Sequence, residues 1–72
     1  MPLEAELLDA HRRDDRVALV RLYTKAADRC ETGGDIDAAC FFLTHAYIFG
    51  LEMAHPDTAA LHARLVAFGR ES

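Results

Sequence analysis

The sequence contains few of the residues that characterise small secreted proteins. Tryptophan is absent among the 72 residues, and cysteine and proline occur twice each. Cys30 and Cys40 are too few for a disulfide scaffold, and in a reducing compartment buried thiols are the expected state. Both flank the Gly33-Gly34 pair, so a hairpin could bring them together, but a disulfide needs a geometry that spacing alone does not specify. We expect two packed free thiols.

Long apolar runs are also missing. No uncharged apolar stretch of about 18 residues, the length that spans a bilayer, occurs in the chain. The first residues, Met1-Pro2-Leu3-Glu4, contain neither the basic nor the apolar segment of a secretory signal. We therefore expect a cytoplasmic protein that does not bind membranes.

Charge of one sign is not concentrated in any part of the chain. Eight basic and twelve acidic residues give a net charge of -4 with neutral histidines. The densest basic segment, formed by Arg12, Arg13 and Arg16, is interrupted by Asp14 and Asp15. A nucleic-acid-binding domain typically carries a continuous basic stripe, and a helix-turn-helix places a polar or basic helix after its turn. Here the most apolar segment follows the tightest turn, so we expect no nucleic-acid partner.

Metal-ligating spacings are absent as well. The soft and imidazole ligands of the chain are Cys30, Cys40, His11, His45, His55 and His62. None of them forms a C-x-x-C, H-x-x-x-H or H-E-x-x-H motif, which would place two ligands on one metal ion. His55 and His62 lie at and beyond a helix start, where solvation explains both. We expect neither a metal nor another cofactor.

Catalytic pairs can be named, but each has a simpler explanation. His45 and Glu52 are seven residues apart on one helical face, and Asp35 and Asp37 stand at a helix start. Capping and the helix dipole account for the two aspartates, and His45 fits the boundary of a packed face. A small helical domain also lacks the deep pocket that substrate chemistry uses. We expect a protein that is not an enzyme.

What the chain does contain is the composition of a folded domain. Apolar residues make up 51% and charged residues 28% of the sequence, which is ordinary globular usage. A chain of this length forms one domain, residues 1–72, and buries only about 60% of the surface of its unfolded form. Apolar surface left over by so thin a core is available to a partner.

Apolar residues recur at helical spacing in four segments, which predicts an all-α fold of antiparallel helices. The expected helices span residues 3–12, 15–32, 35–54 and 57–69. Pro2 suits the first turn of the first helix, Asp14 or Asp15 can cap the second, and His55-Pro56-Asp57 separates the last two. The predicted buried stripes are Leu3, Leu7, Leu8 and His11 in the first helix, Leu19, Leu22, Tyr23, Ala26, Ala27 and Cys30 in the second, and Leu61, Leu65 and Phe68 in the fourth.

The segment Gly33-Gly34-Asp35 marks the clearest turn. The glycines suit a helix C-terminus and Asp35 suits an N-cap, so one helix stops and another starts within three residues. So short a link predicts an antiparallel hairpin. Breaks at Asp14, Asp35 and Pro56 are 21 residues apart, and this interval superposes Ala18, Ala39 and Ala60, as well as Leu19, Cys40 and Leu61. A pair of such helices has the length of a helical solenoid unit.

The hairpin resembles a tetratricopeptide repeat over about residues 15–54. The residues that carry the resemblance are Gly34-Asp35-Ile36-Asp37 at the turn, Ala39, Leu43 and Ala46 on the second helix, and Tyr23, Ala26, Ala27 and Cys30 on the first. Ala26 and Cys30 are smaller than the usual occupants, and no proline ends the second helix at the usual place. The resemblance implies a scaffold that binds peptides or proteins and carries no catalytic role. About one repeat is present, so the chain is either a compact bundle or is completed by another chain.

The third predicted helix is apolar around most of its circumference. One face contains Ala39, Cys40, Leu43, Ala46, Tyr47 and Leu51, and Phe41, Phe42, Ile48 and Phe49 widen it. Such a helix is either a central core helix or carries an exposed apolar surface. The candidate interface residues are Phe41, Phe42, His45, Ile48 and Phe49.

These observations favour a non-enzymatic module for protein–protein interaction or self-association, most simply a homodimer, that uses the third helix. The alternative is a helical bundle that binds a small ligand or a metal in a cavity lined by Cys40, His45 and Tyr47.

Overall fold

The computed structural model describes residues 2–71, and this part of the chain is all-helical, as the sequence predicts. It forms four helices: α1 (Leu3–Arg12), α2 (Arg16–Thr32), α3 (Ile36–Met53) and α4 (Thr58–Ala67). The expected and observed boundaries differ most at the end of α4, which stops at Ala67 because Gly69 turns the chain out of the helix with a φ of +75°.

Aspartate side chains begin the two long helices. The Asp15 carboxylate accepts a hydrogen bond of 3.1 Å from the Ala18 amide, and the Asp35 carboxylate accepts an equivalent bond of 3.1 Å from the Ala38 amide. Asp15 is therefore the cap, and Asp14 instead adopts a left-handed backbone with a φ of 53°. Each cap satisfies an amide that the first helical turn leaves without a partner.

All four helices end in the same way. A left-handed residue follows each helix, at Asp14, Gly34, Ala54 and Gly69. The next amide then bonds back to a carbonyl five residues earlier, in the pairs Asp15–Ala10, Asp35–Cys30, His55–Gly50 and Arg70–Leu65, each at 2.9 Å. These are Schellman motifs, which provide hydrogen-bond donors for carbonyl groups that lack a partner at the end of a helix. Of the two turn glycines only Gly34 needs its conformational freedom, with a φ of +83°.

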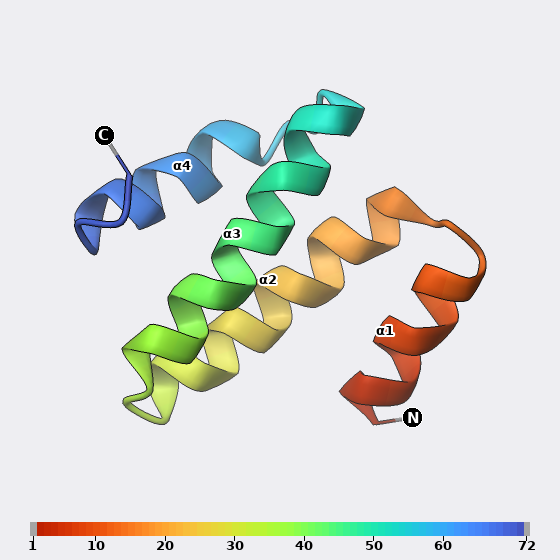
Figure 1. Ribbon diagram of the computed structural model, residues 1–72, viewed down its shortest axis with the longest axis horizontal. Coiled ribbons are helices and arrows are strands. Elements are labelled where there is room, and N and C mark those ends of the chain that lie inside the picture. The colour runs from red at the N-terminus through yellow and green to blue at the C-terminus, as the bar shows by residue number, and fades with distance from the viewer. Residues whose placement is uncertain (1, 72) are drawn as a thin grey trace.

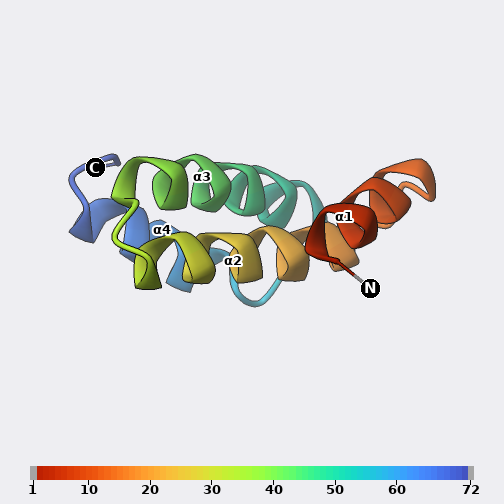
Figure 2. The same cartoon turned by 90° about the horizontal axis from the view of Figure 1, so that it is seen from below.

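The helices pack as sequential neighbours in two layers. α2 and α3 form the predicted antiparallel hairpin, α1 packs on α2, and α4 packs on α3 (Figure 1). In Figure 2, α3 lies above, α2 and α4 lie below, and α1 stands at the far edge beside α2. The molecule is thin, with extents of 32 × 28 × 13 Å. Among the described helices, none therefore lies above one broad face of α3.

Two apolar clusters hold these helices together. The larger cluster joins α2, α3 and α4 and contains Val20, Ala27, Cys40, Leu43, Ala46, Leu61 and Leu65. The smaller cluster joins α1 to α2 and contains Ala10, Leu19 and Leu22. Leu19, Cys40 and Leu61, which the 21-residue interval superposes, are all buried. The predicted stripes of α2 and α4 are thus largely confirmed.

Three residues assigned to packed positions, Leu8, His11 and Leu51, are exposed instead. Leu8 is 61% exposed because α1 packs on α2 through Leu3, Leu7 and Ala10, which lie on its other side. Leu51 is 56% exposed, at the rim of the cleft between α3 and α4, whereas the adjacent Gly50 is buried against Thr58. Ala60, which the 21-residue interval superposes on Ala18 and Ala39, is also exposed.

Candidate docking surface on the third helix

The five candidate interface residues differ in how far α3 exposes them. Phe41 is 58% exposed and Ile48 is 49% exposed. Phe42, His45 and Phe49 are half-buried and pack toward α2 and α1. We call Phe42, His45 and Phe49 the packed trio; the exposed Phe41 ring contacts two of its members, with its centroid 4.5 Å from His45 and 5.5 Å from Phe42.

Tyr23 is the residue that holds the packed trio in place. Its ring lies 5.9 Å from Phe49 in a stacked arrangement, 6.1 Å from Phe42 and 5.1 Å from His45, measured between ring centroids. We call these four residues, with His11, the aromatic cluster. Because its rings come from α1, α2 and α3, the cluster ties the first helix to the hairpin.

His11 closes the aromatic cluster from α1. Its Nε2 atom and the Tyr23 hydroxyl form a hydrogen bond of 2.7 Å, and its ring also meets Phe49 edge-on. Burial raises the pKa of the Tyr23 phenol above its usual value of 10.0. Sequence periodicity placed both residues on apolar stripes and did not pair them, since a contact between residues 11 and 23 depends on how α1 meets α2.

The exposed side of α3 forms a continuous stripe with an apolar centre. We define the outer stripe as Phe41, Thr44, Ile48 and Leu51, bounded by His45 along one edge and by Asp37 and Glu52 at its ends. Asp37 pairs with Arg70 from the C-terminal segment, and Glu52 pairs with Arg16 of α2 at 3.1 Å. Each terminal carboxylate therefore already has a cation beside it, so the stripe presents apolar side chains between two neutralised ends.

The pairs considered for catalysis are engaged elsewhere. His45 Nδ1 donates a hydrogen bond of 2.9 Å to the Phe41 carbonyl, while Glu52 pairs with Arg16. Asp35 is a helix cap and Asp37 pairs with Arg70. These side chains are therefore held by capping and ion pairing, and His45 and Glu52 do not face one reacting atom.

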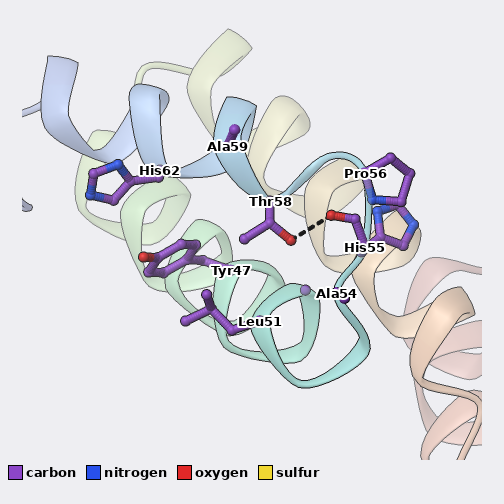
Figure 3. Close-up of a pocket in the computed structure, with 9 residues that line it drawn as sticks. Tyr47, Leu51, Ala54, His55, Pro56, Thr58, Ala59 and His62 are labelled. Atoms are coloured by element: carbon purple, nitrogen blue, oxygen red, sulfur yellow. Dashed lines mark hydrogen bonds between the residues drawn. The ribbon is translucent and has the colours of Figure 1, made fainter.

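The alternative interpretation places Cys40, His45 and Tyr47 around one cavity. Tyr47 lines a shallow cleft of about 450 Å³ between α3 and α4, opposite His62, with ring centroids 5.4 Å apart (Figure 3). Cys40 lines a different hollow, beside Arg70, and His45 lines neither. Neither of these two hollows brings Cys40, His45 and Tyr47 together.

Figure 3 also places the two C-terminal histidines. His55 and His62 are both half-buried, so neither is simply solvated as the sequence suggested. His55 Nδ1 accepts a hydrogen bond from the Asp57 amide at 3.1 Å, and its carbonyl accepts one from the Thr58 hydroxyl at 2.8 Å. Within residues 2–71, no three histidine, cysteine or acidic side chains gather as a group that could hold a metal ion.

α3 has a further property that its composition explains. Among the described helices, this 18-residue helix is long and apolar enough to cross a membrane when only length and composition are considered. The central helix of a soluble protein meets the same criterion. Buried residues make up 28% of it, and the large apolar residues that remain exposed include Phe41, Ile48 and Leu51.

Comparison of the chain with protein-family models, with curated proteins and with solved structures found no match in any of the three. The functional argument therefore depends on the surface of α3 itself.

Proposed function

We propose that this protein is a non-enzymatic, cytoplasmic protein-interaction module that self-associates as a homodimer through the outer stripe of α3. The observation that carries the proposal is the exposure of Phe41, Ile48 and Leu51, each about half exposed or more on one side of one helix. Complete burial of a large apolar side chain stabilises the buried state by about 1.5–3 kcal/mol relative to leaving the side chain in water. A helix that leaves three of them in water gains by meeting a second apolar surface.

A second copy of the chain is the occupant that fits this stripe best. Phe41 and Ile48 lie equally far from the point between Thr44 and His45. Two copies of α3 packed antiparallel about that point therefore place Phe41 of one copy opposite Ile48 of the other. An isologous contact requires this kind of self-matching pattern.

The ends of the stripe also suit an antiparallel pair. Asp37 of one copy would approach Glu52 of the other, but the Asp37–Arg70 and Glu52–Arg16 pairs bring a cation to each carboxylate. At each end of the contact, acidic and basic side chains then alternate, so two unpaired carboxylates do not face each other. Antiparallel helices also oppose their dipoles favourably at both ends.

The resemblance of the hairpin to a tetratricopeptide repeat supports the same class of function. We propose that the α2–α3 hairpin is a repeat of this kind, and the complete burial of Ala39, Leu43 and Ala46 supports the assignment. Such repeats act as protein-binding scaffolds and bring no catalytic role with them. A single repeat is too short to form a stable stack on its own. A second copy of the chain supplies a further surface against which the repeat can pack.

Light scattering tests the proposal with one double variant and one control variant. The wild-type chain at high micromolar concentration should have the mass of a dimer. Phe41→Glu combined with Ile48→Glu should give a monomer with the same helix content by circular dichroism, because both residues are exposed. Val66→Glu, which places the same charge on an exposed apolar residue of α4, should remain a dimer. A monomeric wild-type chain, or a dimer that survives the double substitution, would contradict the proposal.

A further inference from the structure

The exposed side of α1 carries a second pattern of side chains, which the proposed dimer contact through α3 does not involve. Leu8 of α1 is 61% exposed, more than any other large apolar residue of the described chain. Glu4 precedes it by four residues and Arg12 follows it by four, and both are exposed. The three side chains therefore occupy one ridge of the helix, with an acid, an apolar residue and a base in order.

The charges at the two ends of this ridge are unpaired. Neither Glu4 nor Arg12 forms an ion pair with any described residue. Other charges of the same helix do find partners, since Arg13 lies 2.9 Å from Asp9 and 3.1 Å from Asp15. Glu4 and Arg12 are eight residues apart, which is about 12 Å along a helix, so they cannot neutralise each other.

We propose that the ridge Glu4–Leu8–Arg12 is a homotypic contact, in which α1 of one chain packs antiparallel on α1 of a second copy with the two Leu8 side chains at the centre. The pattern is self-complementary about Leu8. Antiparallel packing brings Glu4 of each chain to Arg12 of the other, so both unpaired charges gain a partner and the most exposed leucine is covered. Rows spaced by four residues are also the ridges that interlock in the commonest class of helix packing.

The same face offers room for the incoming leucine. Ala5 is the small neighbour of Leu8 toward the row that contains Asp9 and Arg13. A leucine entering beside Ala5 meets only a methyl group, and the Arg13–Asp9 ion pair lies further along the same row. The contact is thus apolar in the middle and charged at the rim, as protein interfaces generally are.

The size of α1 sets the strength of this contact. A helix of 10 residues is about 15 Å long, so the contact belongs to the small interfaces that form weak complexes. We expect it at millimolar concentration, whereas the α3 contact forms at micromolar concentration. Because α1 and α3 are different faces, a dimer formed through α3 presents two free α1 ridges and can join further copies.

Charge exchange tests the contact directly. All chains carry Phe41→Glu and Ile48→Glu, so that association through α3 is absent, and sedimentation equilibrium measures association at millimolar concentration. This parent chain should dimerise weakly. Glu4→Arg or Arg12→Glu, each alone, should lower the association constant about tenfold, because like charges then meet twice. An equimolar mixture of the two should recover it, since every contact in the mixed dimer pairs an acid with a base.

The controls separate this contact from general charge effects. Glu71→Arg and Lys25→Glu make the same two charge changes outside α1, and their mixture should associate no better than either chain alone. Leu8→Ser should abolish association with helix content unchanged. The proposal is overturned if the parent chain remains monomeric, or if mixing the two α1 variants restores nothing. Neither result bears on the α3 dimer, which the parent chain cannot form.

Discussion

Single residues explain why three of the five candidate interface residues are packed. Phe42, His45 and Phe49 pack around the ring of Tyr23. The Tyr23 hydroxyl also forms a hydrogen bond of 2.7 Å with His11 Nε2. Helical periodicity identifies these residues as apolar or aromatic, but it does not specify which of them meet. The contact between His11 and Tyr23 depends on the angle between α1 and α2, which local sequence patterns do not encode. The packed trio was therefore indistinguishable from the exposed pair in the sequence.

The phenol of Tyr23 predicts a pH dependence of stability at alkaline pH. Burial raises its pKa in the folded chain, whereas the unfolded phenol has a pKa of about 10. Below that pH both states are protonated and the phenol adds no pH dependence. Above it the unfolded chain loses the proton first, so the free energy of unfolding falls as the pH rises through the folded pKa.

Urea unfolding of Tyr23→Phe measures this effect. At neutral pH the free energy of unfolding of the variant should be about 1 kcal/mol lower, because the hydrogen bond to His11 is lost. Between about pH 9 and pH 11, around the unfolded phenol pKa, its free energy of unfolding should fall less than that of the wild-type chain. Tyr47→Phe, the matched control, should retain the wild-type decline. An equal decline in the wild-type chain and in Tyr23→Phe would contradict the assignment.

At the scale of helices, the ends were predictable and the buried faces only in part. Asp15, Gly34 and Asp35 act through neighbours in sequence, so their caps and turns can be identified from residue type. The sequence placed Leu8 and Leu51 on packed faces. A short apolar stripe is compatible with two orientations of the helix that differ by a small rotation about its own axis. Which orientation is adopted depends on the neighbouring helix, and beside Leu51 it is Gly50 that is buried against Thr58.

The junction between α3 and α4 requires a glycine at position 50. A Cβ atom there would lie 2.7 Å from Thr58 Oγ1, far inside contact distance. The Thr58 hydroxyl cannot easily withdraw, because it donates a hydrogen bond to the His55 carbonyl. This close approach allows α4 to start directly against the last turns of α3.

Gly50→Ala should therefore destabilise the protein by about 1–3 kcal/mol, the usual result of overpacking, although alanine is the better helix former. Gly50→Ala combined with Thr58→Ala should recover much of this loss, since the obstructing oxygen is removed. Gly33→Ala should have little effect, because a Cβ atom there meets nothing closer than 3.5 Å. Thermal unfolding of the three variants measures the difference, and an unchanged Gly50→Ala melting temperature would contradict the close approach.

At the scale of the whole molecule, a thin two-layer fold leaves one side of its most apolar helix uncovered. The sequence predicted four helices, a tight hairpin and an excess of apolar surface on the third helix, because these follow from periodicity, capping residues and chain length. The division of that surface could not be predicted, since it depends on α2 and α4 both lying beneath α3 while α1 stands aside. The outer stripe of α3 is what remains after this packing.

The central claim is that two copies meet along this stripe with Phe41 of one opposite Ile48 of the other. The most direct measurement is an isotope-filtered nuclear Overhauser experiment on an equimolar mixture of unlabelled chains and chains labelled at isoleucine methyl groups. The chain has two isoleucines, Ile36 and Ile48, and Ile36 is half-buried against the core. We predict intermolecular signals from the Ile48 methyl to the Phe41 ring and none from Ile36. A concentrated mixture with no intermolecular signal at Ile48 would contradict the account.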